Sequence, residues 1–339
     1  GKVTMDEFIA QMSEDDLARI ARGAGGMQSS LGSGGNAGVF GGVETSLRDL
    51  GIVPVSTHDG PSGLRLRDTD SSSLLPIGSL LACTWNNELV EYLYSLLGEE
   101  MIINGVDILL APGMNLQRDP LCGRNFEYFS EDPLITGMMG AATTRGVQAS
   151  GAGACLKHFA GNNQETNRKK TDSRLSERAL REIYLRGFEI AVKTSDPFTV
   201  MSGYNKLNGV WCCYNYELMT TILRDQWGYN GMLMTDWSMQ SAQSPFNENV
   251  KDNAYRVQAQ LDLYMPGDFS NASIKNALGK GLTLGELQRS AKNILNCVLL
   301  TPKFARENAL EYHQYAKPET YFQVTGGDKV DGESARLSS

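Results

Sequence analysis

The sequence predicts an α/β fold of the TIM-barrel, (β/α)8-like type, with a strand set that is one short and a polar arm at its C-terminal end. Two observations predict it. Short, continuous apolar runs alternate with longer segments of helical periodicity over residues 1–300. The runs do not alternate with polar residues, which is typical of strands in a parallel sheet covered on both faces. Seven such units favour closure into a barrel.

The predicted strands are the apolar runs themselves. In chain order they are residues 51–56, 80–83, 107–111, 152–159, 198–203, 231–235 and 261–265. A closed barrel of this type has eight strands, so the eighth is missing, hidden or supplied from elsewhere. Residues 23–42 hold many glycines but neither a G-x-G-x-x-G nor a P-loop lysine. They predict a tightly turning loop near the barrel mouth rather than a phosphate cradle.

Helices are expected between these strands. Residues 87–104 carry leucines on one helical face, and Asp132, followed by proline, is a typical N-cap. Charged residues predict a long helix over 172–194. Thr283 and Glu286 form a T-x-x-E capping box before a last helix that ends near residue 300.

The chain has 339 residues, enough for one large barrel or two ordinary domains. We interpret residues 1–300 as a barrel catalytic domain that carries the reactive carboxylate. Residues 301–339 are polar, which indicates a linker or C-terminal arm.

Composition argues against several classes of partner. A formal net charge of −8 disfavours nucleic acid and anionic membranes, and no apolar run is long enough to span a bilayer. The first residues do not resemble a signal peptide. The six cysteines form no C-x-x-C pair and only three histidines are present, so a structural zinc site is not expected. The cysteine pattern favours a reducing compartment, and hence a cytoplasmic over a secreted location.

Polar side chains follow several of the apolar runs. In a (β/α)8 barrel the active site lies at the C-terminal ends of the strands, so these side chains are expected to converge. They are Asp59, Arg124, Lys157, His158, Tyr204, Asp236 and Trp237.

Each of these residues also has a structural explanation when it is taken alone. Asp236 could cap a helix, and Asp59 stands in a D-G-P turn. Lys157 and His158 would point to opposite sides of a regular strand, so one of them could be structural.

Arg124 could pair with Glu127 or Glu131 and do no more than hold its loop, while Tyr204 and Trp237 could fill the core. The set as a whole favours a sugar site, because sugar hydroxyls bind charged and bidentate groups and the apolar face of a sugar stacks on an aromatic ring.

A nucleophilic carboxylate must be ionised to react. We expect Lys157 and Arg124 to lower the pKa of Asp236 and to keep it charged.

The motifs around these residues resemble the N-terminal barrel of family 3 glycoside hydrolases, of the β-glucosidase type. They run in order from about residue 50 to residue 300. The matching segments are DGPSGLR from Asp59, GRNFEYFSEDP from Gly123, KHFAGNNQE from Lys157, MSGYNKLNG from Met201 and GMLMTDW ending at Trp237.

This resemblance implies a retaining, exo-acting β-glucosidase that removes terminal β-D-glucosyl residues from oligosaccharides without a metal or organic cofactor. Asp236 matches the nucleophile of the family, which forms a covalent glycosyl-enzyme. The residues that match the sugar-binding positions are Asp59, Arg124, Lys157, His158 and Tyr204, with Arg168 as a further arginine and Trp237 as a wall of the subsite.

The sequence also departs from the family pattern. In the β-glucosidases of this family the acid/base is a Glu on an α/β-sandwich domain, and this chain contains no such domain. We therefore expect the acid/base to lie outside the chain, on a sandwich domain of the full-length protein.

Three other functions stay open, and one branch of the family is disfavoured. A β-xylosidase of the same family would tend to carry Glu in place of Asp59. The N-acetylglucosaminidase branch would carry a His where Arg174 stands, which disfavours it. A barrel without catalysis would bind sugar only, and a Schiff-base aldolase would use Lys157.

Overall fold

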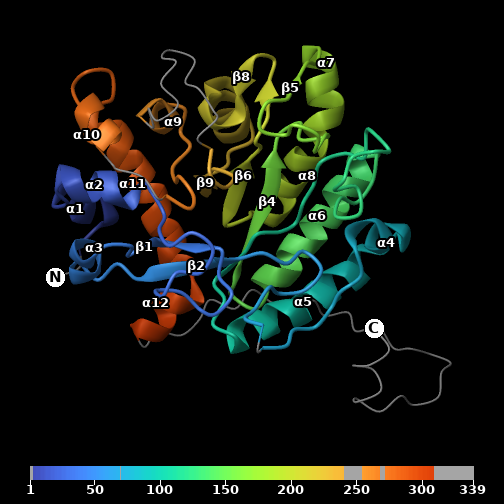
Figure 1. The fold of residues 1–339 in the computed structure, drawn as a ribbon, viewed down its shortest axis with the longest axis horizontal. Coiled ribbons are helices and arrows are strands. Elements are labelled where there is room, and N and C mark those ends of the chain that lie inside the picture. The colour runs from blue at the N-terminus through green and yellow to red at the C-terminus, as the bar shows by residue number, and fades with distance from the viewer. Residues whose placement is uncertain (1–2, 69, 240–253, 268–271, 309–339) are drawn as a thin grey trace.

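The computed structural model describes residues 3–68, 70–239, 254–267 and 272–308. A six-stranded sheet forms its centre, in the order β1-β2-β3-β4-β6-β9 (Figure 1). Its strands are β1 (Gly38–Gly41), β2 (Pro54–His58), β3 (Ile108–Leu109), β4 (Gly153–Phe159), β6 (Thr199–Ser202) and β9 (Met232–Met234). All neighbours from β2 to β9 are parallel, whereas β1 is antiparallel to β2.

Single bridges close this sheet into a ring. Leu263 pairs in parallel with Met234 at the end of β9, and its neighbour Tyr264 pairs in parallel with Arg22. Two residues further on, Ala24 pairs antiparallel with Val39 of β1. The predicted barrel type is thus confirmed, and residues 22–24 together with β1 occupy the two strand positions that the sequence did not predict.

Two strand predictions need correction. Residues 80–83, predicted as a strand, belong to helix α4 (Gly78–Cys83). A four-residue apolar run is compatible with a buried helix as well as a strand, and only tertiary packing decides between them. Conversely, β1 lies inside the glycine-rich segment 23–42 that was predicted as a loop.

The long helix predicted over 172–194 is also wrong in its first part. Residues Asp172–Ser173 form strand β5, which pairs with β7 (Lys206–Leu207) in a small sheet that β8 (Val210–Trp211) completes. The helical part begins only after Ser176, whose side chain caps the backbone N–H of Ala179. It continues as α7 (Glu177–Ala179), a π-helical segment η1 (Leu180–Tyr184) and α8 (Arg186–Ser195).

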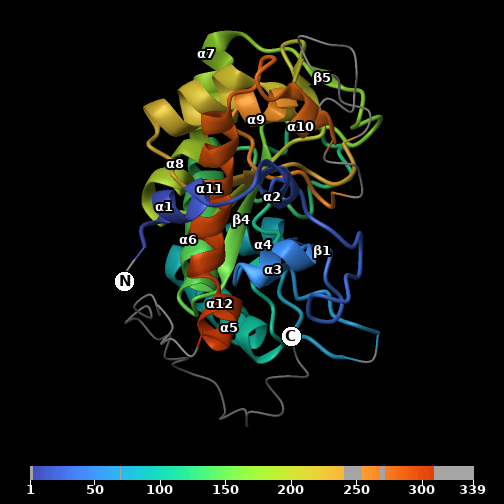
Figure 2. The same cartoon turned by 90° about the vertical axis from the view of Figure 1, so that its left-hand side faces the viewer.

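The other predicted helices are confirmed. Asp132 caps α6 (Pro133–Gln148) by accepting from two backbone N–H groups, and Thr283 with Glu286 forms the expected capping box. Figure 1 shows α5, α6 and α8 on one side of the sheet, and Figure 2 shows α11 running along the opposite side. The remaining bounds are α1 (Met5–Ala10), α2 (Glu14–Ile20), α3 (Thr45–Asp49), α5 (Asn87–Ile103), η2 (Cys212–Tyr214), η3 (Glu217–Gln226), α9 (Ala254–Gln258), α10 (Ala272–Ala277), α11 (Leu284–Leu300) and α12 (Pro302–Glu307).

The strands are apolar throughout because both of their faces are buried. In β4, Ala154 and Leu156 pack in the core that holds α5, α6 and α8, whereas Cys155 between them packs in the core that holds α2 and α11. The barrel wall therefore separates two apolar layers, as the continuous runs predicted.

Of the expected C-terminal arm, the structure describes only residues 301–308. Within it, α12 is tied to the barrel, because Asp107 before β3 accepts a hydrogen bond from the backbone N–H of Lys303. Residues 309–339 lie outside the described residues. In the part of the chain that is described, no helix combines the length and the apolar character needed to cross a bilayer.

Candidate active site

The loops that follow β2, β3, β4, β6 and β9 meet at one pocket of about 200 Å³. It lies at the carboxyl ends of the parallel strands, where barrels of this type place their sites. All eight residues singled out from the sequence line it, together with three apolar side chains. The lining residues are Met27, Asp59, Leu110, Arg124, Lys157, His158, Arg168, Met201, Tyr204, Asp236 and Trp237.

Asp236 follows β9 directly and is only 7% exposed. Its Oδ1 accepts a hydrogen bond of 2.7 Å from the backbone N–H of Trp237. Its Oδ2 has no hydrogen-bond partner among the described residues, and the nearest ring nitrogen of His158 is 3.7 Å away. One carboxylate oxygen is therefore fixed while the other is left for a bound molecule.

Burial raises the pKa of Asp236 from 3.8 to about 6. The N–H of Trp237, the charges of Arg124 and Lys157 and the hydroxyl of Tyr204 all lower this pKa, but they do not outweigh burial. The expectation that the two cations hold the pKa below its ordinary value was therefore wrong in the net effect. The carboxyl group still ionises below neutral pH.

Arg124 is held by a second carboxylate in its own loop. Glu127 accepts from Arg124 through both oxygens, at 2.6 Å from Nε and 2.9 Å from Nη2. The same carboxylate lies 3.4 Å from Nζ of Lys157. The predicted pairing of Arg124 with Glu127 is thus present, and it leaves Nη1 of Arg124 facing the other pocket residues.

His158 is neutral in this environment. Burial and the nearby charges of Arg124 and Lys157 hold its pKa well below the ordinary value. Nη1 of Arg124 lies 3.0 Å from Nε2, and because an arginine only donates, Nε2 must accept. The proton is therefore on Nδ1, which lies 3.2 Å from the Tyr128 hydroxyl and 3.3 Å from Oδ1 of Asn115.

Lys157 and His158 both line the pocket although they are neighbours in β4. The pairing of β4 with β6 is regular at Leu156, shifts register after it and resumes at Phe159. This irregularity breaks the strict alternation of side chains on which the sequence argument for a merely structural residue relied.

Tyr204 is buried beside Asp236, and burial together with the charge of Asp236 raises its pKa. The guanidinium of Arg168 stacks over the Tyr204 ring at 4.6 Å and donates to Glu165 at 3.0 Å. Arg168 thus lines the pocket from the loop after β4 while it anchors the ring below it.

Asp59 and Trp237 lie nearer the opening. Asp59 is partly exposed, with its carboxylate 3.8 Å from the guanidinium of Arg65. Its neighbour Gly60 has φ +133°, and a Cβ there would meet the carbonyl oxygen of Gly63 at 1.9 Å, so the turn requires glycine. The Trp237 ring is fixed because Nε1 donates to the carbonyl of Ala37 at 2.7 Å.

Sequence reasoning missed part of the pocket's support. It treated Glu127 only as a loop residue, and it did not single out Tyr128 or Asn115, which orient His158. Only the three-residue spacing from Arg124 signalled Glu127. Arg174 is not in the pocket; it pairs with Asp172 on the surface.

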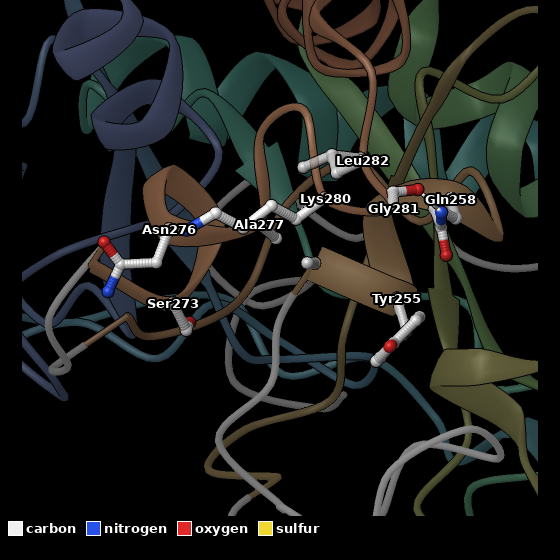
Figure 3. Close-up of a pocket in the computed structure, with 9 residues that line it drawn as sticks. Tyr255, Gln258, Ser273, Asn276, Ala277, Lys280, Gly281 and Leu282 are labelled. Atoms are coloured by element: carbon white, nitrogen blue, oxygen red, sulfur yellow. Dashed lines mark hydrogen bonds between the residues drawn. The ribbon is translucent and has the colours of Figure 1, made fainter.

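Another pocket of the described structure offers less chemistry. A second pocket, between α9, α10 and the turn that reaches Leu282 (Figure 3), has Lys280 as the single charged residue among its described lining residues. No group of three or more His, Cys, Asp or Glu side chains in the described ranges could hold a metal ion.

The chain was then compared with known proteins. The sequence profile of the glycosyl hydrolase family 3 N-terminal domain matches residues 12–297. A β-glucosidase of Ruminococcus albus is 48% identical over 311 residues, which are 91% of this chain and 33% of that protein. An exo-α-(1→6)-L-arabinopyranosidase of Bifidobacterium longum is 39% identical over 283 residues, 80% of this chain and 36% of that protein.

Solved structures give the same picture. A β-glucosidase from Paenibacillus barengoltzii superposes with a TM-score of 0.84 at 48% identity, over 90% of this chain and 34% of that one. β-Glucosidase 3B from Thermotoga neapolitana, in complex with glucose, gives a TM-score of 0.79 at 40% identity, over 89% of this chain and 43% of that one. The chain spans about a third of the length of the curated relatives it matches.

Proposed function

Because its residues 12–297 match the N-terminal domain of glycosyl hydrolase family 3, this chain belongs to that family, and we propose that it is the catalytic barrel of a retaining, exo-acting β-glucosidase. Its substrate would be the terminal β-D-glucosyl residue of an oligosaccharide or other β-glucoside. One observation carries the proposal: Asp236 is a buried carboxylate whose Oδ2 has no partner among the described residues, beside two cations in a pocket at the strand ends.

Asp236 is the proposed nucleophile. Oδ2 attacks the anomeric carbon and the bond to the leaving oxygen breaks, which gives a covalent glycosyl-enzyme that water then hydrolyses. The N–H of Trp237 holds Oδ1 and so orients the attacking oxygen. With a pKa of about 6 the carboxylate is ionised at neutral pH.

The other polar residues are proposed to bind the sugar in the subsite beside the cleaved bond. Lys157 and Arg124 donate to its hydroxyls, with Asp59 accepting from the opening side. Nε2 of His158 accepts from Arg124, so His158 acts by accepting or by holding Arg124. Tyr204 and Arg168 complete the polar wall, and the fixed Trp237 ring supplies the aromatic one.

The acid/base is proposed to come from elsewhere in the full-length protein. Relatives are about three times as long as the matched region, which leaves room for an α/β-sandwich domain that carries it. The leaving oxygen would then be protonated by a Glu outside this chain.

Glucose is favoured over other sugars by the β-glucosidase relatives and by the glucose bound in the Thermotoga neapolitana structure. A xyloside remains the second candidate within the family, and the arabinopyranosidase relative adds another pentose. An aldolase is disfavoured because Nζ of Lys157 lies 3.4 Å from the carboxylate of Glu127, in an ion pair that a Schiff base on this nitrogen would give up.

The test is covalent labelling with a 2-fluoro-glucoside whose leaving group departs without protonation, so that labelling does not depend on the acid/base. We expect one glycosyl adduct, mapped to the peptide that contains Asp236, and none in Asp236→Ala. The 2-fluoro-xyloside is run in parallel. An adduct with the xyloside alone would reassign the substrate, and an adduct that persists in Asp236→Ala would refute the nucleophile. A barrel that binds glucose in a titration but takes no label would be a sugar-binding domain.

A further inference from the structure

Glu127 is the buried carboxylate of the site to which the proposed reaction assigns no role. It is 6% exposed, and it contacts the two cations that border Asp236. Burial would raise its pKa, but Lys157 and Arg124 lower it further, so the net shift is downward. Glu127 is therefore a permanent negative charge under the pocket.

The surroundings of Glu127 leave space for this carboxylate and no more. Gly113, after β3, lies against it, since a Cβ at residue 113 would be 2.9 Å from Oε1. At Gly78, the start of α4, a Cβ would be 2.2 Å from the Glu127 carbonyl. Two elements thus fix the backbone and the side chain of Glu127 independently of Arg124.

Glu127 is the carboxylate that both cations beside Asp236 contact. Two cations, Arg124 and Lys157, lie beside two carboxylates, Glu127 and Asp236, and His158 is neutral. The other titratable groups around this set are Tyr94 from α5, Cys155 of β4, Tyr128, Tyr204, Arg168 with its partner Glu165 and, at the opening, Asp59 with Arg65.

We propose that Glu127 is a positioning residue for the glycosidase reaction: it fixes Arg124 and Lys157 toward the sugar and balances their charge beside Asp236. The inference rests on the proposed function. The bidentate contact uses Nε and Nη2 of Arg124 and so directs Nη1 into the pocket. Without this contact the guanidinium keeps only its single contact to Nε2 of His158, and Arg124 and Lys157 lose the carboxylate that they share.

The test compares Glu127→Gln, Glu127→Asp and the matched control Glu131→Gln, which removes the other glutamate of the same loop. Two quantities are measured on each folded variant. One is the titration of the Asp236 carboxyl by ¹³C NMR, which requires no sugar. The other is the concentration dependence of labelling by the activated 2-fluoro-glucoside.

In Glu127→Gln we expect the Asp236 titration to move to lower pH by about one unit, because two cations then act on one carboxylate. The inhibitor concentration for half-maximal labelling should rise by about tenfold or more. Glu127→Asp keeps the negative charge, but its shorter side chain does not extend to both cations. In this variant the titration of Asp236 should stay near wild type, while the inhibitor concentration for half-maximal labelling rises. Glu131→Gln should match wild type in both.

Unchanged titration and unchanged labelling in Glu127→Gln would overturn the proposal. A purely structural role would lower the melting temperature and leave both measurements of the folded fraction unmoved. If Glu127→Gln does not fold, the proposal stands on Glu127→Asp, and labelling of that variant at wild-type concentrations would overturn it. If wild type takes no label but the Asp236 titration shifts in Glu127→Gln, the proposed function fails, whereas the electrostatic role of Glu127 beside Asp236 stands.

Discussion

Replacing Asp236 by Asn is expected to make the protein more stable at neutral pH. The carboxylate is buried, and its Oδ2 has no hydrogen-bond partner among the described residues, so ionisation in the folded state is unfavourable. Asn has nearly the same shape and can keep the hydrogen bond from Trp237 through its carbonyl oxygen. It carries no charge that must be desolvated.

The magnitude follows from the pKa. Burial raises the pKa of Asp236 from 3.8 to about 6 even after Arg124 and Lys157 have acted on it. One unit of pKa is worth about 1.4 kcal/mol, so ionising Asp236 costs the folded state about 3 kcal/mol. Because the folded pKa is raised, the stability from the protonated form is fully present below pH 3.8 and is lost as pH rises through about 6.

The free energy of unfolding is therefore to be measured by denaturant titration at a series of pH values. The gap between Asp236→Asn and wild type should be small near pH 4 and reach about 3 kcal/mol above pH 7, or about 5–10 °C in Tm. Asp225→Asn, which removes the same charge at an exposed position, should change stability by less than about 0.5 kcal/mol. A gap that is independent of pH, or an Asn variant less stable than wild type at pH 7.5, would refute the reasoning.

Two further predictions concern the scaffold of the pocket. Arg256→Met should lower the free energy of unfolding by about 3–5 kcal/mol, because the buried guanidinium donates to the carbonyls of Ala21, Leu261 and Asp262 where the barrel closes. Thermal unfolding measures this change, and a loss below about 1 kcal/mol would contradict the prediction. Gly60→Ala should weaken glucose binding, measured by calorimetry, by about tenfold with little change in Tm, because the added Cβ would displace the turn that carries Asp59. Unchanged affinity would mean that this turn does not position a sugar ligand.

The sequence was sufficient for those parts of the fold that depend on local pattern. The apolar runs at β4, β6 and β9 are uninterrupted because both faces of these strands are buried, and the caps at Asp132 and Thr283 are local side-chain-to-backbone contacts. Most of the pocket residues were indicated for the same reason. They lie at or after the end of a strand, and parallel strands bring their carboxyl ends together. Arg168 was indicated by the family resemblance alone.

What could not be predicted depends on partners that are distant in the chain. Residues 80–83 are as apolar as a strand, but a hydrogen bond from Ser79 to the carbonyl of Asn125 and the packing of Gly78 on Glu127 hold them in a helix. β1 is a strand because Ala24 and β2 pair with it from opposite sides. In both cases the deciding contact lies more than a dozen residues away, where periodicity carries no information.

The sign of the pKa shift at Asp236 has the same origin. Residue types alone place two cations beside the carboxylate and predict a lowered pKa, but the extent of burial is set by the whole barrel and outweighs them. Among the polar side-chain atoms of Asp236, Arg124 and His158, one has no hydrogen bond to a described residue that would offset its burial. Oδ1 of Asp236, the fork of Arg124 and both nitrogens of His158 have partners, whereas Oδ2 has none in the described structure. Under the proposed reaction this same oxygen attacks the anomeric carbon, so the instability that Asp236→Asn would relieve is the property that the proposed nucleophile needs.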